Sequence, residues 1–488
     1  MTDTTGPAAA PLTDGLADRL AAIGVALDAF AATGSDPVPR RAAWQAALGG
    51  PLPERGVGAD AVLAELADVV VPNGTRLMEP GWWGYITNGP TTVPLVASVA
   101  AAVAAPQRYT LTAFNLLEEQ SLEWLAELCG LEPHLRGVYS SGGSVANLVA
   151  LGAARQHACE ERGVDAGADG LGGLRLVVYA SDETHHTVQR AAGVLGIGRS
   201  SVRRVGTDAQ LRMRPDLLDE AITADVAAGV VPMAVVGTAG TTNTGSIDDL
   251  RALGEVAHRY GAWFHVDGAY GLPGILDDRV AARYDGLELA DSAIVDPHKW
   301  LGAPIGIGAT FVRDRSLLHR AFTQEPAAYL ETDGGDGDRA ESSLDSMGTP
   351  YADLGVELSA QSRGVVVWSI LRELGRAGVT ARVRADDDHA RRIADLARRH
   401  PRLELLLEPV LSICCFRYVP GPDHDADVVN AEILRRLHRG SAFIPSSTRV
   451  RGQYALRPCF INPRTTTQLV DAFVDAVVTL GDEIVAGG

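Results

Sequence analysis

The chain has 488 residues, 46% hydrophobic and 21% charged, which is the composition of an ordinary globular protein too long for one small core. Its net charge of −18 repels nucleic acid phosphates and anionic membrane surfaces, so a general polyanion-binding role is disfavoured. The five cysteines have neither zinc-site spacing nor the density of a disulfide scaffold, and no signal peptide or membrane-spanning run is evident. We therefore expect reduced thiols and a cytoplasmic protein that acts on small molecules.

Residues 1–75 predict an N-terminal helical segment. Apolar residues recur at helical spacing from Leu16 to Phe30 and from Val62 to Val70, and a Gly- and Pro-rich stretch separates the two runs. Residues 76–380 are expected to form a large domain, and residues 381–488 a small C-terminal α/β domain.

Between about residues 137 and 313, short apolar runs alternate with amphipathic helical segments. The runs are Leu174–Ala180, Met233–Thr238, Ala262–Asp267, Ser292–Val295 and Ala309–Val312. This alternation predicts an α/β domain with a mostly parallel central sheet and helices on both faces. Ligands of such sheets bind at the carboxyl ends of the strands, so the residues that follow each run are candidates for chemistry.

The turn Ser140–Ser144 follows a short apolar strand and opens a helix. Glycines let the backbone approach a ligand closely, and exposed amides at a helix start bind anions, so this turn is a candidate phosphate cradle. Gly/Ser turns are common, and the motif alone is weak. A second turn, Gly240–Gly245, brings threonine hydroxyls to another strand end.

Two adjacent histidines, His185 and His186, follow the run Leu174–Ala180. A metal site is disfavoured, because adjacent side chains point in different directions and no Cys or carboxylate partner has metal-ligand spacing. We expect one imidazole to stack on an aromatic ring and the other to lie at the surface or in a dimer contact.

Asp267 ends the buried run WFHVD, and a carboxylate in that position requires a cationic partner. A protonated pyridine nitrogen would satisfy it, and the pair would let the ring accept electrons from a breaking bond. The alternative is that Asp267 only caps the following loop.

Lys299, in the run DPHKW, is the only lysine among 43 Lys and Arg residues. An arginine matches a lysine in charge, but its guanidinium stays protonated and cannot condense with an aldehyde. A lone surface lysine could survive by chance. Its position after a buried strand indicates instead that the chain needs a primary amine there.

The Ser/Gly turn, His185, Asp267 in HVDGAY and Lys299 in DPHKW occur in one order along the chain. Together they resemble the group II pyridoxal-phosphate-dependent amino acid decarboxylases, the family of aromatic-L-amino-acid decarboxylase. The resemblance extends from about Gly81 to the C-terminal LRPCFINPRTT. It implies the aspartate aminotransferase-like fold (fold type I) of pyridoxal-phosphate-dependent transferases, pyridoxal 5'-phosphate as cofactor, and a homodimer.

The resemblance also implies roles. Lys299 would form a Schiff base with the cofactor aldehyde, Asp267 would pair with the pyridine nitrogen, and His185 would stack on the ring. The remaining implied cofactor contacts are Gly142, Gly143, Ser144 and His298 to the phosphate, and Thr241 and Ala269 to the ring. Asp296 stands where many relatives have Asn beside the phosphate, so its role is left open.

The family places a tyrosine on a mobile loop, and Tyr351, after the Gly- and Asp-rich stretch 331–350, looks like its match. Its phenol would return a proton to Cα after decarboxylation. Relatives with Phe at that position make an aldehyde instead, so a tyrosine favours simple decarboxylation. The alternative is that Tyr351 only anchors the loop.

The resemblance implies that the stretch 81–87 lines the substrate side-chain pocket, with Trp83, Tyr85, Ile86 and Thr87 as candidates. Such a wall favours an aromatic or bulky apolar L-amino acid over glutamate, which would need a charged partner such as Arg. Aromatic clusters are more often plain core.

Two rivals remain. The first is a pyridoxal-phosphate enzyme with another outcome, either an oxidative aldehyde synthase or an aminotransferase. The second is a cofactor-sensing regulator with a DNA-binding module, which would require a basic helix-turn-helix segment that the acidic-to-neutral N-terminal region does not show.

Overall fold

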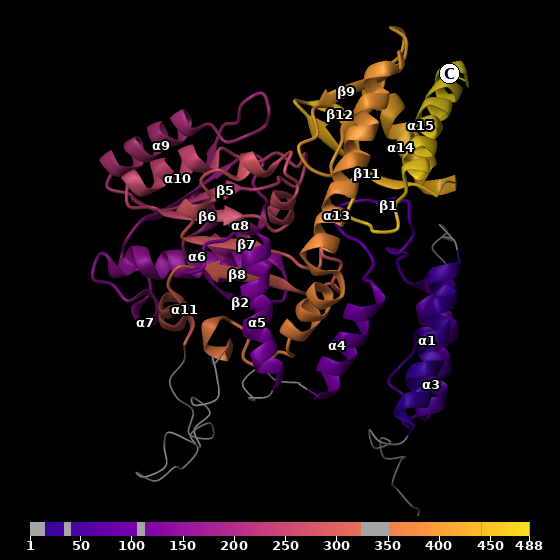
Figure 1. The fold of residues 1–488 in the computed structure, drawn as a ribbon, viewed down its shortest axis with the longest axis horizontal. Coiled ribbons are helices and arrows are strands. Elements are labelled where there is room, and N and C mark those ends of the chain that lie inside the picture. The colour runs from indigo at the N-terminus through magenta and orange to yellow at the C-terminus, as the bar shows by residue number, and fades with distance from the viewer. Residues whose placement is uncertain (1–14, 34–40, 105–112, 324–350, 441, 488) are drawn as a thin grey trace, which may run out of the picture.

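The computed structural model describes residues 15–33, 41–104, 113–323, 351–440 and 442–487 (Figure 1). Two sheets organise it, one in a large domain and one in a smaller domain. Within the described ranges, no helix combines the length and the apolar character needed to cross a membrane.

The large sheet has seven strands in the order β2-β8-β7-β6-β5-β3-β4. Their bounds are β2 Arg136–Ser140, β3 Leu176–Ser181, β4 Val202–Val205, β5 Val231–Thr238, β6 Trp263–Asp267, β7 Ser292–Val295 and β8 Gly308–Val312. Neighbours from β7 to β4 pair in parallel, whereas β8 is antiparallel to both of its neighbours. The mostly parallel sheet and all five predicted runs are confirmed. The strand β4 escaped prediction because its two central arginines face outward and leave only two apolar residues.

Helices cover both faces of this sheet (Figure 1). Their bounds are α5 Ala113–Leu128, α6 Gly143–Glu160, α7 Ala166–Asp169, α8 Thr187–Val194, α9 Pro215–Ala227, α10 Leu250–Arg259 and α11 Arg315–Phe322. Successive residues of β6 show the two layers, since His265 bonds to α6 while Phe264 packs beside Gly254 of α10. Short turns of helix join these elements: η3 Arg199–Ser201, η4 Leu272–Leu276, η5 Ala281–Tyr284, η6 Leu287–Leu289 and η8 Tyr351–Leu354.

The smaller domain has a five-stranded sheet in the order β1-β11-β12-β10-β9. Its elements are β1 Trp82–Trp83, β9 Leu403–Leu407, β10 Cys415–Tyr418, α14 Ala426–Gly440, β11 Ile444–Val450, β12 Gln453–Arg457 and α15 Thr467–Gly487. The strand β1 pairs in parallel with β11, so residues 82–83, which we expected in the large domain, join the small sheet. The long helix α13, Gly364–Arg399, links the two domains and bends at Gly375, whose φ of 60° is one that glycine adopts without strain.

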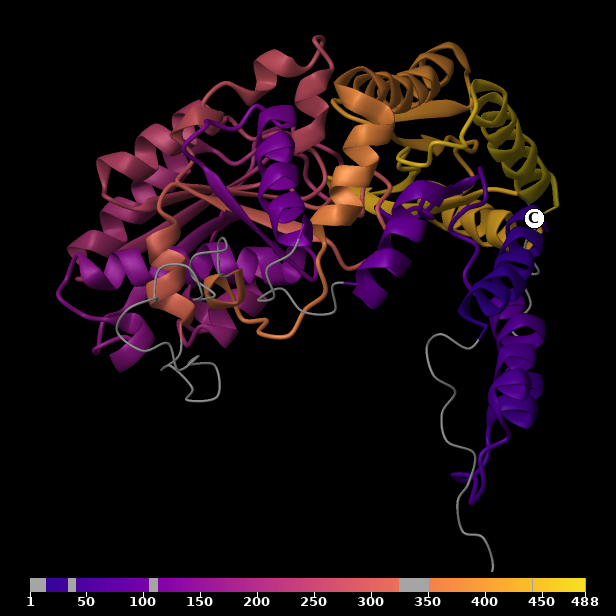
Figure 2. The ribbon, with the colours of Figure 1, turned by 60° about the horizontal axis from the view of Figure 1, so that its bottom comes forward.

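The described part of residues 1–75 is helical. Its elements are α1 Leu16–Ala32, α2 Arg41–Leu48, α3 Ala59–Glu65, η1 Leu66–Val70 and η2 Val71–Asn73, and the helix α4 Thr92–Ala104 follows after them. Figures 1 and 2 show α1 and α3 standing apart from the large sheet, and neither helix contains a buried residue. Apolar side chains on these helices therefore face outward in the single chain.

Candidate active site

The carboxyl ends of β3, β5, β6 and β7 surround a cavity of about 290 Å³. The residues that line it are Ser141, Gly142, Gly143, Ser144, Asn147, His185, Thr187, Thr238, Gly240, Thr242, Asp267, Ala269, Tyr270, Asp296, His298, Lys299, Ile305 and Gly306. The position follows from the topology, because parallel strands deliver the residues that succeed them to one edge of the sheet. Nearly all of the residues predicted to bind a cofactor meet here.

The predicted phosphate cradle lies at the start of α6. Gly142 precedes the helix with a φ of 113°, and no side chain caps the helix start, so its first amides face the cavity edge without a side-chain acceptor. A Cβ on Gly142 would lie 3.2 Å from the His298 ring, and one on Gly143 would lie 2.5 Å from Asp296 Oδ2. Glycines are therefore required for this close packing, and the free helix start suits an anion.

Lys299 lies in the loop after β7, and its backbone is held from two directions. Asn88 donates from Nδ2 to the carbonyl of Lys299 and to that of Ile461, each at 2.8 Å. The next residue, Trp300, donates from its indole nitrogen to Asp386 at 2.9 Å. The amine itself lies 3.1 Å from Asp296 Oδ2.

Asp267, at the end of β6, is only 5% exposed. Its Oδ2 accepts a hydrogen bond from Asn147 Nδ2 at 3.1 Å, and its Oδ1 accepts one from the backbone amide of Ala269 at 3.2 Å. Because both donors are neutral, the carboxylate keeps its negative charge available to a cation in the cavity.

His185 Nδ1 lies 2.9 Å from the hydroxyl of Thr187. Burial lowers the pKa of His185, while the nearby Asp267 opposes that shift, so the imidazole is neutral near pH 7. A neutral, flat ring at the cavity wall suits stacking. Its neighbour His186 is exposed, and the two ring centroids are 4.1 Å apart.

His298 is oriented by its backbone surroundings. Its Nδ1 donates to the carbonyl of Ile307 at 2.6 Å, since a carbonyl oxygen can only accept, and Nε2 lies 3.9 Å from Asp296 Oδ2. The ring therefore stands beside Gly142, where the sequence predicted a phosphate contact.

Tyr351 is not brought into the cavity. It is 1% exposed, its hydroxyl donates to Glu119 of α5, and the guanidinium carbon of Arg315 lies 5.5 Å from its ring centroid. Burial raises the pKa of the phenol. This placement corrects the prediction of Tyr351 as a proton donor in the cavity and matches the alternative of a residue that anchors the chain.

Thr241 is also turned away from the cavity. Its hydroxyl lies 3.0 Å from that of Thr244 and accepts from the amide of Ser246 at 3.1 Å, which closes the turn after β5. The adjacent Gly240 and Thr242 line the cavity instead. At this strand end it is therefore Thr242, and not the predicted Thr241, that lines the cavity.

The predicted substrate pocket is not assembled within one chain. Trp83 is fully buried in the core of the smaller domain, where it contacts the rings of Phe443, Phe460 and Phe473, so it cannot touch a substrate. Tyr85 is 71% exposed, and neither it nor Ile86 nor Thr87 lines the cavity. The prediction that Trp83 lines the substrate pocket is wrong because an aromatic residue next to glycine is equally compatible with a pocket wall and with a core.

Several lining residues were missed. Asn147 lies one helical turn after Gly143 and thus on the same side of α6, and Thr187 lies two residues after His185. Spacing from the predicted residues could have found both.

Arg457, almost fully buried, donates to the carbonyls of Asn243 and Tyr85 at 3.0 and 2.5 Å and so fastens the smaller domain to the turn beside the cavity.

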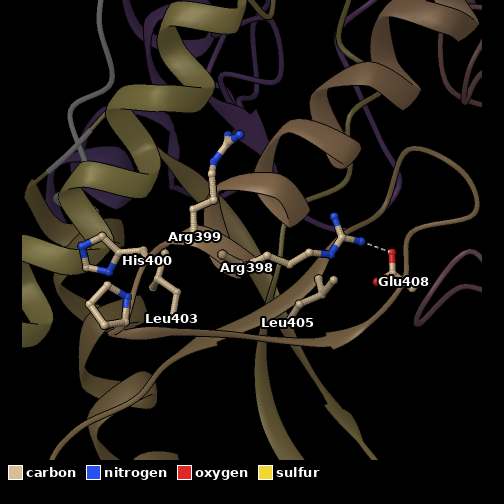
Figure 3. Close-up of a pocket in the computed structure, with 8 residues that line it drawn as sticks. Arg398, Arg399, His400, Leu403, Leu405 and Glu408 are labelled. Carbon is tan, nitrogen blue, oxygen red and sulfur yellow. Dashed lines mark hydrogen bonds and ion pairs between the residues drawn. The ribbon is translucent and has the colours of Figure 1, made fainter.

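A second hollow, of about 520 Å³, lies on the smaller domain where α13 ends (Figure 3). Figure 3 shows Arg398 paired with Glu408, and Leu403 and Leu405 also line the hollow. It lies away from the edge of the large sheet, and its lining combines no amine, carboxylate and anion cradle as the cavity at Lys299 does. The chemistry is therefore assigned to the latter.

The residues at the large-sheet cavity fit an aldehyde cofactor that carries a phosphate and a basic ring nitrogen. Lys299 supplies the amine, Asp267 the carboxylate, and the uncapped start of α6 the anion site. This arrangement defines the class of pyridoxal-phosphate enzymes.

Comparisons with known proteins define the family. The pyridoxal-dependent decarboxylase conserved domain matches residues 46–419. Aromatic-L-amino-acid decarboxylase of Bacillus atrophaeus is 31% identical over 75% of this chain and 73% of its own length, and phenylacetaldehyde synthase of Arabidopsis thaliana is 27% identical over 83% and 82%. The crystal structure of Oryza sativa TDC with PLP and tryptamine has a TM-score of 0.88 and 27% identity, and the match covers 98% of this chain and 100% of that one. The chain belongs to the pyridoxal-dependent decarboxylase family. It is a pyridoxal-phosphate-dependent amino acid decarboxylase of fold type I, as the sequence predicted.

Proposed function

We propose that this decarboxylase converts an aromatic L-amino acid to its amine and carbon dioxide. The observation that carries the proposal is the part of the cavity lining that this chain contributes by itself. Among the described residues that line it there is no arginine, and the only ammonium group is that of Lys299. A glutamate side chain would require a cation of its own, whereas an aromatic side chain requires none. The names of the Bacillus atrophaeus and Oryza sativa relatives support the same substrate class.

Each of these cavity residues has a separate role toward the cofactor. Lys299 would hold the cofactor through its amine, Asp267 would accept a hydrogen bond from the ring nitrogen, and His185 would lie against the ring. The first turn of α6 and His298 would hold the phosphate. When bound, pyridoxal phosphate supplies the electron sink that accepts the pair left by departing carbon dioxide. Asp267 is buried and His185 is half-buried, so little water reaches them, which strengthens these electrostatic contacts.

We also propose a homodimer that completes the substrate pocket. Apolar side chains on the N-terminal helices face outward in the single chain, including Val25 of α1, Val62 of α3 and Val96 of α4. Tyr85 has a left-handed φ of 58° and is held by Ser446 and Arg457, so its exposed ring is presented on a fixed backbone. A fixed aromatic side chain with no role in its own cavity suits the pocket of a second copy.

The test is a panel of L-amino acids incubated with the reconstituted enzyme in closed vessels, with carbon dioxide and amine measured together. We expect kcat/KM for L-tryptophan, L-tyrosine or L-phenylalanine to exceed that for L-glutamate by on the order of 100-fold. Light scattering after size exclusion should give the dimer mass. A preference for glutamate would overturn the proposed substrate class, and a monomer with full activity would overturn the shared pocket.

One observation favours a second candidate, an aldehyde-forming reaction. The argument against it was a tyrosine in the cavity, and Tyr351 is not there. The Arabidopsis thaliana relative is named phenylacetaldehyde synthase. Oxygen uptake and aldehyde in the same vessels distinguish the two, since simple decarboxylation gives one amine per carbon dioxide and consumes no oxygen.

A further inference from the structure

We propose that His265, which does not line the cavity, is a positioning residue that acts through Asn147 on Asp267. The inference rests on the proposed role of Asp267 toward the cofactor's ring nitrogen. It gives a role to a series of buried, hydrogen-bonded side chains that the proposed cofactor contacts leave unexplained.

The geometry of β6 and its neighbours brings the side chains of this hydrogen-bonded series together. Trp263, His265 and Asp267 alternate along β6 and therefore share one face of the sheet. On the adjacent strand β7, Ser292 stands opposite His265 in the register. The helix α6 crosses the same face and brings Asn147 between His265 and Asp267.

Four hydrogen bonds connect these side chains in series. The indole nitrogen of Trp263 donates to Ser292 Oγ at 2.7 Å, and Ser292 Oγ lies 2.8 Å from His265 Nδ1. On the other side of the imidazole, Nε2 lies 3.0 Å from Asn147 Oδ1. Asn147 Nδ2 then donates to Asp267 Oδ2 at 3.1 Å.

The ionised carboxylate of Asp267 lies at the end of this series of hydrogen bonds, and it determines which atom donates in each of them. A carboxylate only accepts, so Asn147 must turn its NH₂ toward Asp267 and its oxygen toward His265. That oxygen also only accepts, so His265 carries its proton on Nε2. Its Nδ1 is then an acceptor for the hydroxyl of Ser292, whose oxygen in turn accepts from the indole.

The same amide also reaches the stacking histidine. Asn147 Nδ2 donates to Thr187 Oγ1 at 3.3 Å, which leaves the Thr187 hydroxyl to donate to His185 Nδ1 at 2.9 Å. Asn147 therefore orders the groups on two sides of the ring site, and His265 orders Asn147.

Because these side chains are buried, a change in this arrangement of donors and acceptors costs free energy. His265 and Ser292 are fully buried and Asn147 is nearly so, which leaves no room for water to substitute for a lost partner. Burial lowers the pKa of His265 to about 4 against the opposing charge of Asp267, so the ring stays neutral and Nδ1 remains an acceptor.

The experiment compares His265→Phe, which removes both ring nitrogens at similar size, with His265→Gln, whose amide N–H can replace the Nε2 donor. Tyr179→Phe is the matched control. It removes a fully buried hydroxyl of the same sheet, 3.0 Å from Asp225, that is not part of this chain. Two readouts are taken without amino acid: the Kd of pyridoxal phosphate for the cofactor-free protein, and the NMR shift of its isotopically labelled ring nitrogen.

For His265→Phe we expect the Kd to rise about tenfold, because Asn147 loses its buried partner and no longer holds its amide toward the charged Asp267. We also expect the ring nitrogen signal to move toward its unprotonated position. His265→Gln should restore most of both, and Tyr179→Phe should change neither. A folded His265→Phe protein with wild-type Kd and nitrogen shift would refute the inference. If His265→Phe fails to fold, Asn147→Ala, which removes the donor directly, decides by the same readouts.

The Asp267→Asn variant distinguishes a failure of the positioning role of His265 from a failure of the proposed role of Asp267. If Asp267→Asn shifts the nitrogen signal and neither His265→Phe nor Asn147→Ala does, the positioning role fails and the role of Asp267 stands. If the wild-type nitrogen is unprotonated, or Asp267→Asn leaves it unchanged, both fail.

Discussion

The amine of Lys299 lies 3.1 Å from Oδ2 of Asp296, three residues earlier in the same loop. Asp296 is 2% exposed, and its Oδ1 has no hydrogen-bond partner among the described residues. The carboxylate also touches the start of α6, since a Cβ on Gly143 would meet it at 2.5 Å. One buried carboxylate therefore faces both the amine and the anion cradle.

This position predicts the effect of Asp296→Asn on cofactor binding. An amide keeps an oxygen for Lys299 and removes a negative charge beside the phosphate site, so we expect the Kd of pyridoxal phosphate to fall several-fold, or by about 1 kcal/mol. Titration of the cofactor-free protein measures it, with Asp296→Ala as the control for lost packing. Weaker binding in the Asn variant would show that the carboxylate's pairing with Lys299 outweighs repulsion of the phosphate.

Lys299→Arg should abolish decarboxylation, with kcat lower by at least about a thousandfold, because a guanidinium cannot condense with the aldehyde. Since Lys299 is the only lysine, borohydride reduction of the reconstituted wild type should attach the cofactor to a single peptide. Mass spectrometry reads that peptide. Labelling at the N-terminus alone would contradict the assignment.

The buried His265 predicts how stability depends on pH. Its pKa is about 4 in the folded chain against an ordinary value of 6.5. Between these values the unfolded chain binds a proton that the folded chain refuses, so the free energy of unfolding falls as pH falls through this window. The slope reaches about 1.4 kcal/mol per pH unit, and the total is about 3 kcal/mol. Urea unfolding at pH 7 and pH 4.5 should show a smaller difference for His265→Gln than for the wild type. Equal differences would mean that His265 is not the group responsible.

The two tyrosines around the Gly- and Asp-rich stretch can be separated by mutation. Tyr351→Phe removes a hydroxyl bonded to Glu119, so we expect lower thermal stability with the ratio of amine to carbon dioxide unchanged. Tyr329 lies outside the described residues and is the other tyrosine of this part of the chain. If a tyrosine returns the proton to Cα, Tyr329→Phe is the variant expected to lower amine yield and raise aldehyde. Aldehyde from Tyr351→Phe alone would restore the prediction made from the sequence.

Trp83 is expected to matter for stability and not for substrate choice. Trp83→Ala empties a site packed by three phenylalanines and should cost about 3–5 kcal/mol in the free energy of unfolding. Trp83→Phe should keep the relative kcat/KM values of the amino acid panel. A changed preference in Trp83→Phe would return this residue to the substrate pocket.

The sequence by itself determined the large sheet and most of the cavity edge. Strands buried on both faces must be continuous apolar runs, and the chain leaves each run at the same edge of a parallel sheet. Asp267 at the end of β6 and Lys299 in the loop after β7 could therefore be assigned to one site without knowing any distance between them. The chemical difference between lysine and arginine then indicated that this site needs a primary amine.

Only the tertiary structure decided which way individual side chains face. Trp83 became core because β1 pairs with β11, and Thr241 turned inward because its hydroxyl closes a turn. The link from His265 through Asn147 to Asp267 likewise depends on α6 crossing β6 at one angle and height. Local spacing predicts which face of its own element a residue occupies, but contacts between elements depend on packing of the whole core, and no short stretch of sequence encodes that packing.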